Sequence, residues 1–145
     1  MFTLLSLSVS AFEVPTFKLP LKESKVDSLK LTLEVIKYKE SRGNYNAIGS
    51  KSEIGAYQIM PPTWNTLCKR YFKRVLKPTR YNQDLIARYY VTELLQKYNV
   101  KQIASIWNCG RETPNNKDTV KYVEHFLQIF NSYLSQSKSL LCSNI

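Results

Sequence analysis

The residue best suited to chemistry in this chain is a glutamate at the end of an apolar helical stripe. The stripe has the spacing of one helix face and runs through Val26, Leu29, Leu33 and Ile36 to Glu40. Gly43 then offers a helix stop. Burial and the negative end of the helix dipole would both raise the pKa of a carboxyl group here. Glu40 is therefore predicted to stay protonated near neutral pH and act as a general acid, unless it turns out to solvent.

The residues around Glu40 form a recognisable motif. The chain reads Glu40-Ser41-Arg42-Gly43-Asn44-Tyr45-Asn46-Ala47 and then Gly55-Ala56-Tyr57-Gln58-Ile59-Met60-Pro61. This pattern resembles the catalytic motif of the lytic transglycosylase SLT family, which belongs to the lysozyme-like superfamily. The matching positions are Glu40, Ser41, Asn44, Ala47, Gly55, Gln58, Met60 and Pro61, whereas Ala56 and Tyr57 replace the usual Leu and Met.

Two later segments resemble the same family in the expected order. The stretch from Ile103 to Gly110 is similar to the family's Ala-Tyr-Asn-Ala-Gly motif, with Trp107 in place of Tyr and Cys109 in place of Ala. The stretch from Asp118 to Val123 is similar to its Glu-Thr-Arg-x-Tyr-Val segment. The resemblance extends from about Val26 to Phe130, which is most of the chain.

The resemblance implies a peptidoglycan lytic transglycosylase that cleaves the MurNAc-GlcNAc bond with one catalytic glutamate. Glu40 would act first as acid and then as base, the C6 hydroxyl of the muramyl residue would close on the anomeric carbon, and an anhydro-muramyl end would form. Most glycosidases use a second carboxylate. Glu53 is the nearby candidate, although a solvated surface role is favoured for it, and Asp118 is expected to cap a helix. A hydrolytic lysozyme and a non-catalytic peptidoglycan-binding or assembly module remain alternatives.

The resemblance also suggests which residues bind substrate. Gly55 would let the backbone approach a sugar, Gln58 offers an amide to an N-acetyl group, and Tyr57 and Trp107 are candidate walls for sugar rings, with a core role equally open. The remaining candidates are Ser41, Asn108 and Tyr122. Trp107 lacks a hydroxyl that the family places near the glutamate. No metal or other cofactor is expected, because the lone His125 has no clustered ligands.

The pattern of apolar residues and helix breakers predicts a mainly α, lysozyme-like single domain of about five helices with a loop-rich catalytic segment. The expected helices are 26–42, one opening at Pro61-Pro62, 83–98, 101–109 and one from about Asp118. The last helix is apolar on two faces, so a central, buried position is expected. Residues 25–145 form the predicted domain, after a short signal segment and extended lead-in at 1–24.

Composition suggests where such a protein works. The net charge of +10 favours an anionic partner, here the cell envelope, and no nucleic-acid motif accompanies it. The apolar start, which ends at Val9-Ser10-Ala11, reads either as a short signal peptide or as an arm packed on the domain, and it is too short to span a bilayer. An extracytoplasmic or virion-associated location is expected. Small domains of this family commonly serve a secretion, conjugation or phage tail assembly.

Three cysteines allow at most one internal disulfide. Cys68, Cys109 and Cys142 fit neither a zinc site nor a redox pair. Buried free thiols are the favoured interpretation, and a disulfide becomes plausible if the protein is exported.

Overall fold

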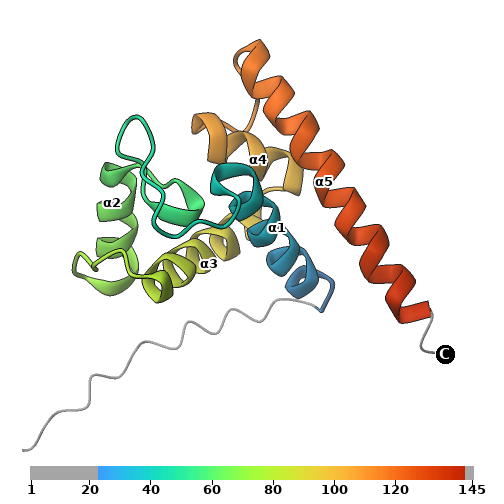
Figure 1. Cartoon of the computed structure of the whole chain (residues 1–145), viewed down its shortest axis with the longest axis horizontal. Helices are drawn as coiled ribbons and strands as arrows, with labels where there is room; N and C mark the ends of the chain where they lie inside the picture. Colours follow the sequence, from blue (N-terminus) through green and yellow to red (C-terminus); the bar gives the residue numbers. More distant parts are fainter. Residues whose placement is uncertain (1–22, 143–145) are drawn as a thin grey trace, which may run out of the picture.

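The computed structural model describes residues 23–142, with side chains over residues 27–137. The predicted signal segment and most of the lead-in therefore lie outside the described residues. Within the described part, the chain forms helices and no strand (Figure 1). The helices are α1 (Glu23–Ser41), the short η1 (Gly55–Tyr57), α2 (Pro61–Phe72), α3 (Arg80–Lys97), α4 (Val100–Cys109) and α5 (Lys117–Cys142). The predicted mainly α fold with five helices and a loop-rich segment is confirmed.

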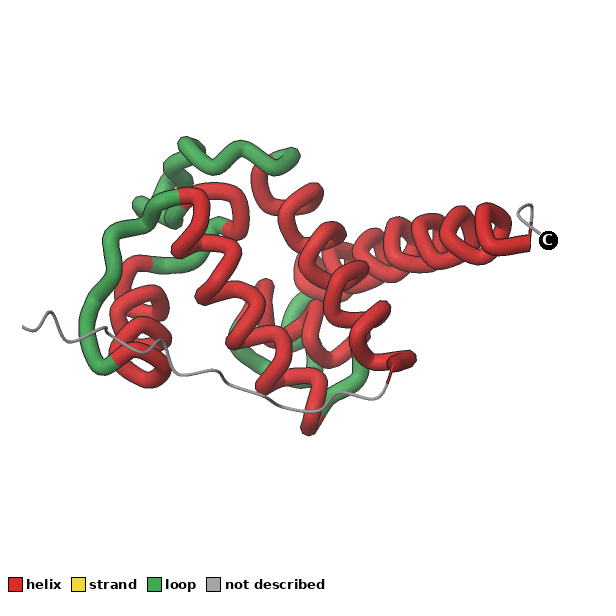
Figure 2. Tube along the Cα trace, turned by 90° about the horizontal axis from the view of Figure 1, so that it is seen from below, coloured by secondary structure: helices red, strands yellow, loops and turns green. Residues whose placement is uncertain are grey.

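The central helix is α1, not the last helix as predicted. It packs against α3, α4, α5 and η1, and Val35 and Ile36 are fully buried. By contrast, α5 lies along one side, contacts α1 and α4, and extends beyond the other helices at its C-terminal end (Figures 1 and 2). Each of its two apolar faces is buried only in part: Val123 and Phe126 are buried, whereas Leu127 and Tyr122, on the same two faces, are partly buried.

Local capping explains where the middle helices begin. The Thr79 side chain accepts a hydrogen bond from the Asn82 backbone N–H, so α3 begins at Arg80, three residues before the predicted start. In α4, Asn99 and Gln102 form a reciprocal capping box. These caps fix the direction of the helices that carry the later site residues.

The cap of α5 is a correction to the prediction for Asp118. The side-chain oxygen of Asn116 accepts the Thr119 N–H at 2.8 Å, so Asn116 occupies the capping position. Asp118 lies one residue inside the helix, in its first turn, where a carboxylate favours the positive end of the helix dipole.

The segment between α1 and α2 holds its shape with little regular structure. Isolated antiparallel bridges join Ile54 to Ile48 and to Ile59. Arg42 and Gly43 both have positive φ angles, which turn the chain away from the end of α1. The Gly43 backbone N–H then donates to the Lys37 carbonyl at 3.1 Å. The segment later packs back on α1 through η1, and the Ser41 hydroxyl, next to Glu40, donates to the Ala56 carbonyl there.

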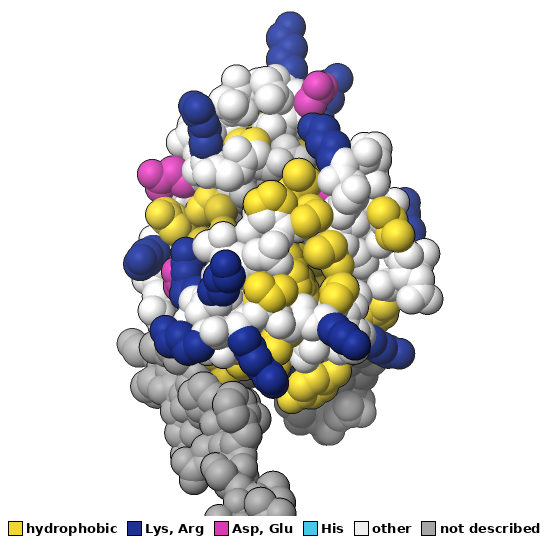
Figure 3. Space-filling model, turned by 90° about the vertical axis from the view of Figure 1, so that its left-hand side faces the viewer, with side chains coloured by type: hydrophobic (Ala, Val, Ile, Leu, Met, Phe, Trp, Pro, Cys, Tyr) yellow, Lys and Arg dark blue, Asp and Glu magenta, His cyan; other side chains and the backbone are white. Residues whose placement is uncertain are grey.

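Basic side chains dominate one face of the surface. On the side that holds α2 and the loop after it, Lys and Arg side chains surround an apolar area, and acidic side chains are few (Figure 3). Six basic residues between the last turns of α2 and the start of α3 belong to this region: Lys69, Arg70, Lys73, Arg74, Lys77 and Arg80. None of the helices in residues 23–142 combines the length and the apolar character that crossing a bilayer requires.

Candidate active site

Glu40 lies at the end of α1, and its carboxyl accepts a hydrogen bond from a tyrosine that is distant in sequence. The Tyr122 hydroxyl, from the first turns of α5, donates to Glu40 Oε1 at 2.5 Å. The two residues are 82 positions apart in sequence, so the contact exists only because α5 packs against α1. Glu40 is partly buried and does not turn out freely to solvent.

The surroundings of Glu40 raise the pKa of its carboxyl above the ordinary value. Loss of hydration on burial is the largest cause, and the negative charge of Glu53 adds to it. The Tyr122 hydrogen bond and the charge of Lys39 act in the opposite direction but do not cancel the rise. The Lys39 ammonium also lies 4.3 Å from the centre of the Tyr122 ring, which holds both groups beside the carboxyl. The site therefore shifts Glu40 towards its protonated form, which is the form that a general acid needs.

Ser41 ties the end of α1 to the returning loop. Its hydroxyl donates to the Ala56 carbonyl at 2.9 Å and accepts the Asn44 backbone N–H at 2.9 Å. Trp107, from α4, donates its ring N–H to the neighbouring Tyr57 carbonyl at 3.2 Å. Residues 56 and 57 are thus held between the end of α1 and the end of α4, which fixes the loop relative to Glu40.

Gly55 is needed for packing. Its φ is +64°, and an added Cβ would collide with the Gln83 side chain. The Gln83 amide accepts the Ala56 N–H at 2.9 Å and donates to the Tyr45 and Pro78 carbonyls. The space beside the Gly55 Cα is therefore filled by protein, while the predicted approach of a sugar to Gly55 stays a prediction.

Tyr57 is a core residue, which corrects its prediction as a sugar platform. Its side chain is only 2% exposed, so no ring face is open to a sugar. Its hydroxyl donates to Asp84 Oδ1 at 2.8 Å, and the Tyr45 hydroxyl donates to the same oxygen at 2.7 Å. Asp84 thereby anchors two points of the loop to α3.

Three predicted binding residues do meet at one cavity of about 330 Å³. Gln58, Trp107 and Asn108 line it together with Tyr90 and Ile106. Trp107 is partly buried and lies 5.7 Å from Tyr90 between ring centres. The exposed Asn108 amide beside this aromatic wall suits a sugar that carries an N-acetyl group. Glu40 does not line this cavity. Two adjacent loop residues connect them: the Ala56 carbonyl accepts a hydrogen bond from Ser41, which follows Glu40, and the Tyr57 carbonyl accepts one from Trp107, which lines the cavity.

Gln58 is held in an unusual backbone conformation. Its backbone adopts a left-handed φ of 48°. Its side-chain amide nitrogen donates to the Gly55 carbonyl at 2.8 Å. Non-glycine residues seldom hold this conformation without support from their surroundings. The Gln58 side-chain oxygen lies beside Gly49, where it would collide with a Cβ added to that glycine.

The sequence interpretation missed the residues that position the loop. Gln83 and Asp84 belong to no motif that we recognised, yet they contact Tyr45, Ala56 and Tyr57. A signal did exist for Gln83: it precedes the buried Ile86 and Ala87 by three and four residues, which places an amide on the apolar face of α3.

Among the described residues, no three His, Cys, Asp or Glu side chains cluster as metal ligands would. Cys68 and Cys109 are free thiols.

A domain of five helices with a partly buried glutamate near the end of its central helix is consistent with a lysozyme-like fold. The family model described as "Transglycosylase SLT domain" matches residues 21–128. The chain therefore belongs to the SLT transglycosylase family, as its motifs indicated, and this family membership assigns it a peptidoglycan-related, lytic transglycosylase type of activity. No curated protein and no solved structure matches the chain significantly.

Proposed function

We propose that this protein is a lytic transglycosylase that cleaves the MurNAc-GlcNAc bond of peptidoglycan with Glu40 as its single catalytic group. The observation that carries the proposal is the carboxyl itself. It ends the central helix of an SLT domain, burial raises its pKa, and the Tyr122 hydroxyl fixes its orientation. A raised pKa keeps the carboxyl protonated to higher pH than that of an exposed glutamate, and the protonated form is the one that a general acid needs.

The proposed reaction has two proton transfers through the same carboxyl. Protonated Glu40 donates its proton to the glycosidic oxygen, the bond from that oxygen to the anomeric carbon breaks, and positive charge grows on the sugar ring. The resulting carboxylate accepts the proton of the C6 hydroxyl as that oxygen bonds to the anomeric carbon. Tyr122 supports the second state, because its hydrogen bond stabilises the ionised carboxyl.

The products of sacculus digestion test this proposal. Purified peptidoglycan sacculi are incubated with the protein, and the soluble fragments are analysed by mass spectrometry. We expect fragments that end in anhydro-muramyl residues, which are lighter by one water than reducing ends. Fragments with reducing ends alone would establish a hydrolase instead.

A hydrolytic lysozyme is the second candidate, and Glu53 is the observation that favours it. Its carboxylate is near enough to Glu40 for its charge to raise the pKa of that group. A hydrolase could use this second carboxylate to activate water. However, the Glu53 carboxylate also accepts the Lys51 backbone N–H at 2.7 Å, which is a structural role in the loop. Replacement by glutamine separates the two roles: a transglycosylase should retain most of its turnover in Glu53→Gln, whereas a hydrolase should lose it.

We also propose that the protein acts outside the cytoplasm, in the periplasm, after secretion or as part of a virion, because its substrate lies there. The excess of positive charge supports contact with an anionic envelope. A role within a secretion, conjugation or phage tail assembly is compatible with a small domain that opens the wall locally. Fractionation of cells or particles, followed by detection of the protein, tests this location.

A further inference from the structure

The end of α2, the loop 73–79 and the start of α3 carry positive charge that no acidic residue nearby in sequence offsets. Residues 54–83 contain six Lys and Arg residues and no Asp or Glu. All six lie between positions 69 and 80, and all are exposed. Within residues 23–142, α2 packs against α3 and against no other helix, which leaves its other side exposed. The charge is therefore concentrated on one exposed surface.

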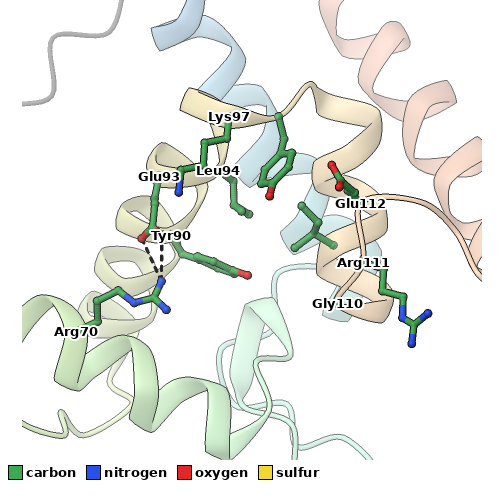
Figure 4. Close-up of a pocket in the computed structure, with 10 residues that line it drawn as sticks. Arg70, Tyr90, Glu93, Leu94, Lys97, Gly110, Arg111 and Glu112 are labelled. Carbon is green, nitrogen blue, oxygen red and sulfur yellow. Dashed lines mark hydrogen bonds and ion pairs between the residues drawn. The ribbon is translucent and has the colours of Figure 1, made fainter.

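Three lysines supply the charge that is available to a partner. The Arg70 guanidinium is already held in an ion pair of 3.1 Å with Glu93 of α3 (Figure 4). Lys69, Lys73 and Lys77 take part in neither of the ion pairs found among the described residues. The Lys73 backbone N–H donates to the Lys69 carbonyl at 3.1 Å, so these two lysines lie close together.

The loop 73–79 is fixed through its backbone to the helices on either side. The ring N–H of Trp64, a buried residue of α2, donates to the Leu76 carbonyl at 2.9 Å. From α3, the Asn82 side-chain amide donates to the Lys77 carbonyl at 2.8 Å. These bonds hold the loop on the protein, so its exposed side chains keep a defined place on the surface.

Apolar side chains are exposed among these cations. Val75 is 50% exposed and Tyr81 is 69% exposed, and they are two of the three most exposed large apolar side chains of the described residues. In sequence, Val75 lies between Arg74 and Lys77, and Tyr81 follows Arg80. The space-filling view shows apolar side chains framed by Lys and Arg on this side of the molecule (Figure 3). Exposed apolar surface with a polar rim is typical of an interaction site.

This combination fits the surface of an anionic lipid bilayer. Lipid phosphates attract Lys and Arg side chains, and each one near the surface strengthens binding by about fivefold. Tyrosine suits the boundary between headgroups and acyl chains, because its ring is apolar and its hydroxyl is polar. A soluble phosphate polymer would satisfy the cations, but it has no acyl region to cover Val75 and Tyr81.

We propose that this surface binds an anionic lipid bilayer. Lys69, Lys73 and Lys77 contact the lipid phosphates. Val75 and Tyr81 enter the headgroup layer. The inference goes beyond the proposed function and uses none of the residues assigned to cleavage, so it adds a membrane partner that does not depend on the chemistry of Glu40.

Sedimentation with lipid vesicles at low salt tests this inference. Vesicles of phosphatidylglycerol and phosphatidylcholine in equal parts are compared with vesicles of phosphatidylcholine alone. The protein should bind the anionic vesicles and leave the neutral ones. Replacing Lys69, Lys73 and Lys77 together by glutamine should weaken binding to the anionic vesicles by about a hundredfold, from about fivefold for each residue.

The matched control replaces Lys30, Lys97 and Lys101 by glutamine. It removes the same charge from exposed positions on α1, the far end of α3 and α4. Its binding to anionic vesicles should stay much closer to that of the wild type. Equal losses in the two triple variants, or equal binding of the wild type to neutral and anionic vesicles, would overturn the proposal.

A second variant distinguishes a bilayer from a soluble polyanion. Val75→Ser combined with Tyr81→Ser should weaken binding to anionic vesicles by roughly tenfold and leave binding to inorganic polyphosphate unchanged. Thermal melts first establish that each variant is folded. Vesicle binding that survives the loss of both apolar side chains would show a site for polyanions and not for a bilayer. Failure to cleave sacculi would count against the proposed function alone, because vesicle binding requires no cleavage.

Discussion

At the scale of single residues, the candidate site depends on a balance around one carboxyl. Burial and the charge of Glu53 favour the protonated form of Glu40, and Tyr122 and Lys39 favour the ionised form. An acid that later serves as a base needs both states to be accessible. Tyr122 also supplies a hydroxyl beside the glutamate, which the sequence appeared to lack because Trp107 replaces a tyrosine.

Replacing Tyr122 by phenylalanine should change the pH dependence of cleavage. The hydrogen bond from Tyr122 lowers the pKa of Glu40, so its removal should raise that pKa further. The alkaline limb of kcat/KM, which reports ionisation of the acid in the free enzyme, should move to higher pH. Tyr133→Phe, on the same helix, is the control and should leave the limb in place. A limb that stays put or moves to lower pH in Tyr122→Phe would contradict this account.

Replacing Glu40 by glutamine should stabilise the fold at neutral pH. Its folded-state pKa is raised above the unfolded value of about 4.3, so its favourable contribution is complete below that value and is lost as pH rises through the folded pKa. Glutamine avoids the cost of an ionised carboxyl in this site. Thermal melts should show the variant more stable than wild type at pH 7 and nearly equal at pH 4. A clearly less stable variant at pH 7 would show that Glu40 is not held in a desolvated site.

At the scale of elements, the loop between α1 and α2 should be sensitive to one added methyl group. Gly55→Ala combines an unfavourable φ with a collision against Gln83, so it should destabilise the protein by roughly 2–5 kcal/mol. Gly43→Ala is the control, because Gly43 has a similar φ of +79° but open space around its Cα. It should cost about 1–2 kcal/mol in denaturant unfolding. Equal costs for the two variants would mean that the contact with Gln83 does not constrain the loop.

The sequence predicted the elements better than their arrangement. Helix existence follows from local periodicity and breakers, so all five helices were predicted. The largest errors are three residues, at the starts of α1 and α3, and at α3 the Thr79 cap was not recognised. The central position of α1 depends on which faces meet, and two apolar faces on α5 gave a misleading signal. The bonds of Gln83 and Asp84 to the loop join positions 27 to 39 residues apart, which no local pattern reveals.

At the scale of the whole molecule, the net charge of +10 should govern contact with the cell wall. Basic side chains predominate on the face that holds α2 (Figure 3). Exposed charges are screened within about 10 Å at 0.1 M salt and about 3 Å at 1 M. The fraction of Glu40→Gln protein that sediments with sacculi should therefore fall as salt rises across this range. Binding that is insensitive to salt would contradict a role of the net charge in contact with the wall.

The central claim is that Glu40 carries out the chemistry alone, and its most direct test is the rate at which the Glu40→Gln variant releases soluble fragments from sacculi. Wild type and variant are compared at equal concentration, after thermal melts have shown that both are folded. The account predicts a loss of at least about 10²–10⁴-fold, the usual contribution of general acid catalysis, with binding to sacculi retained. Release by the folded variant within tenfold of the wild-type rate would contradict the account and place the catalytic group elsewhere.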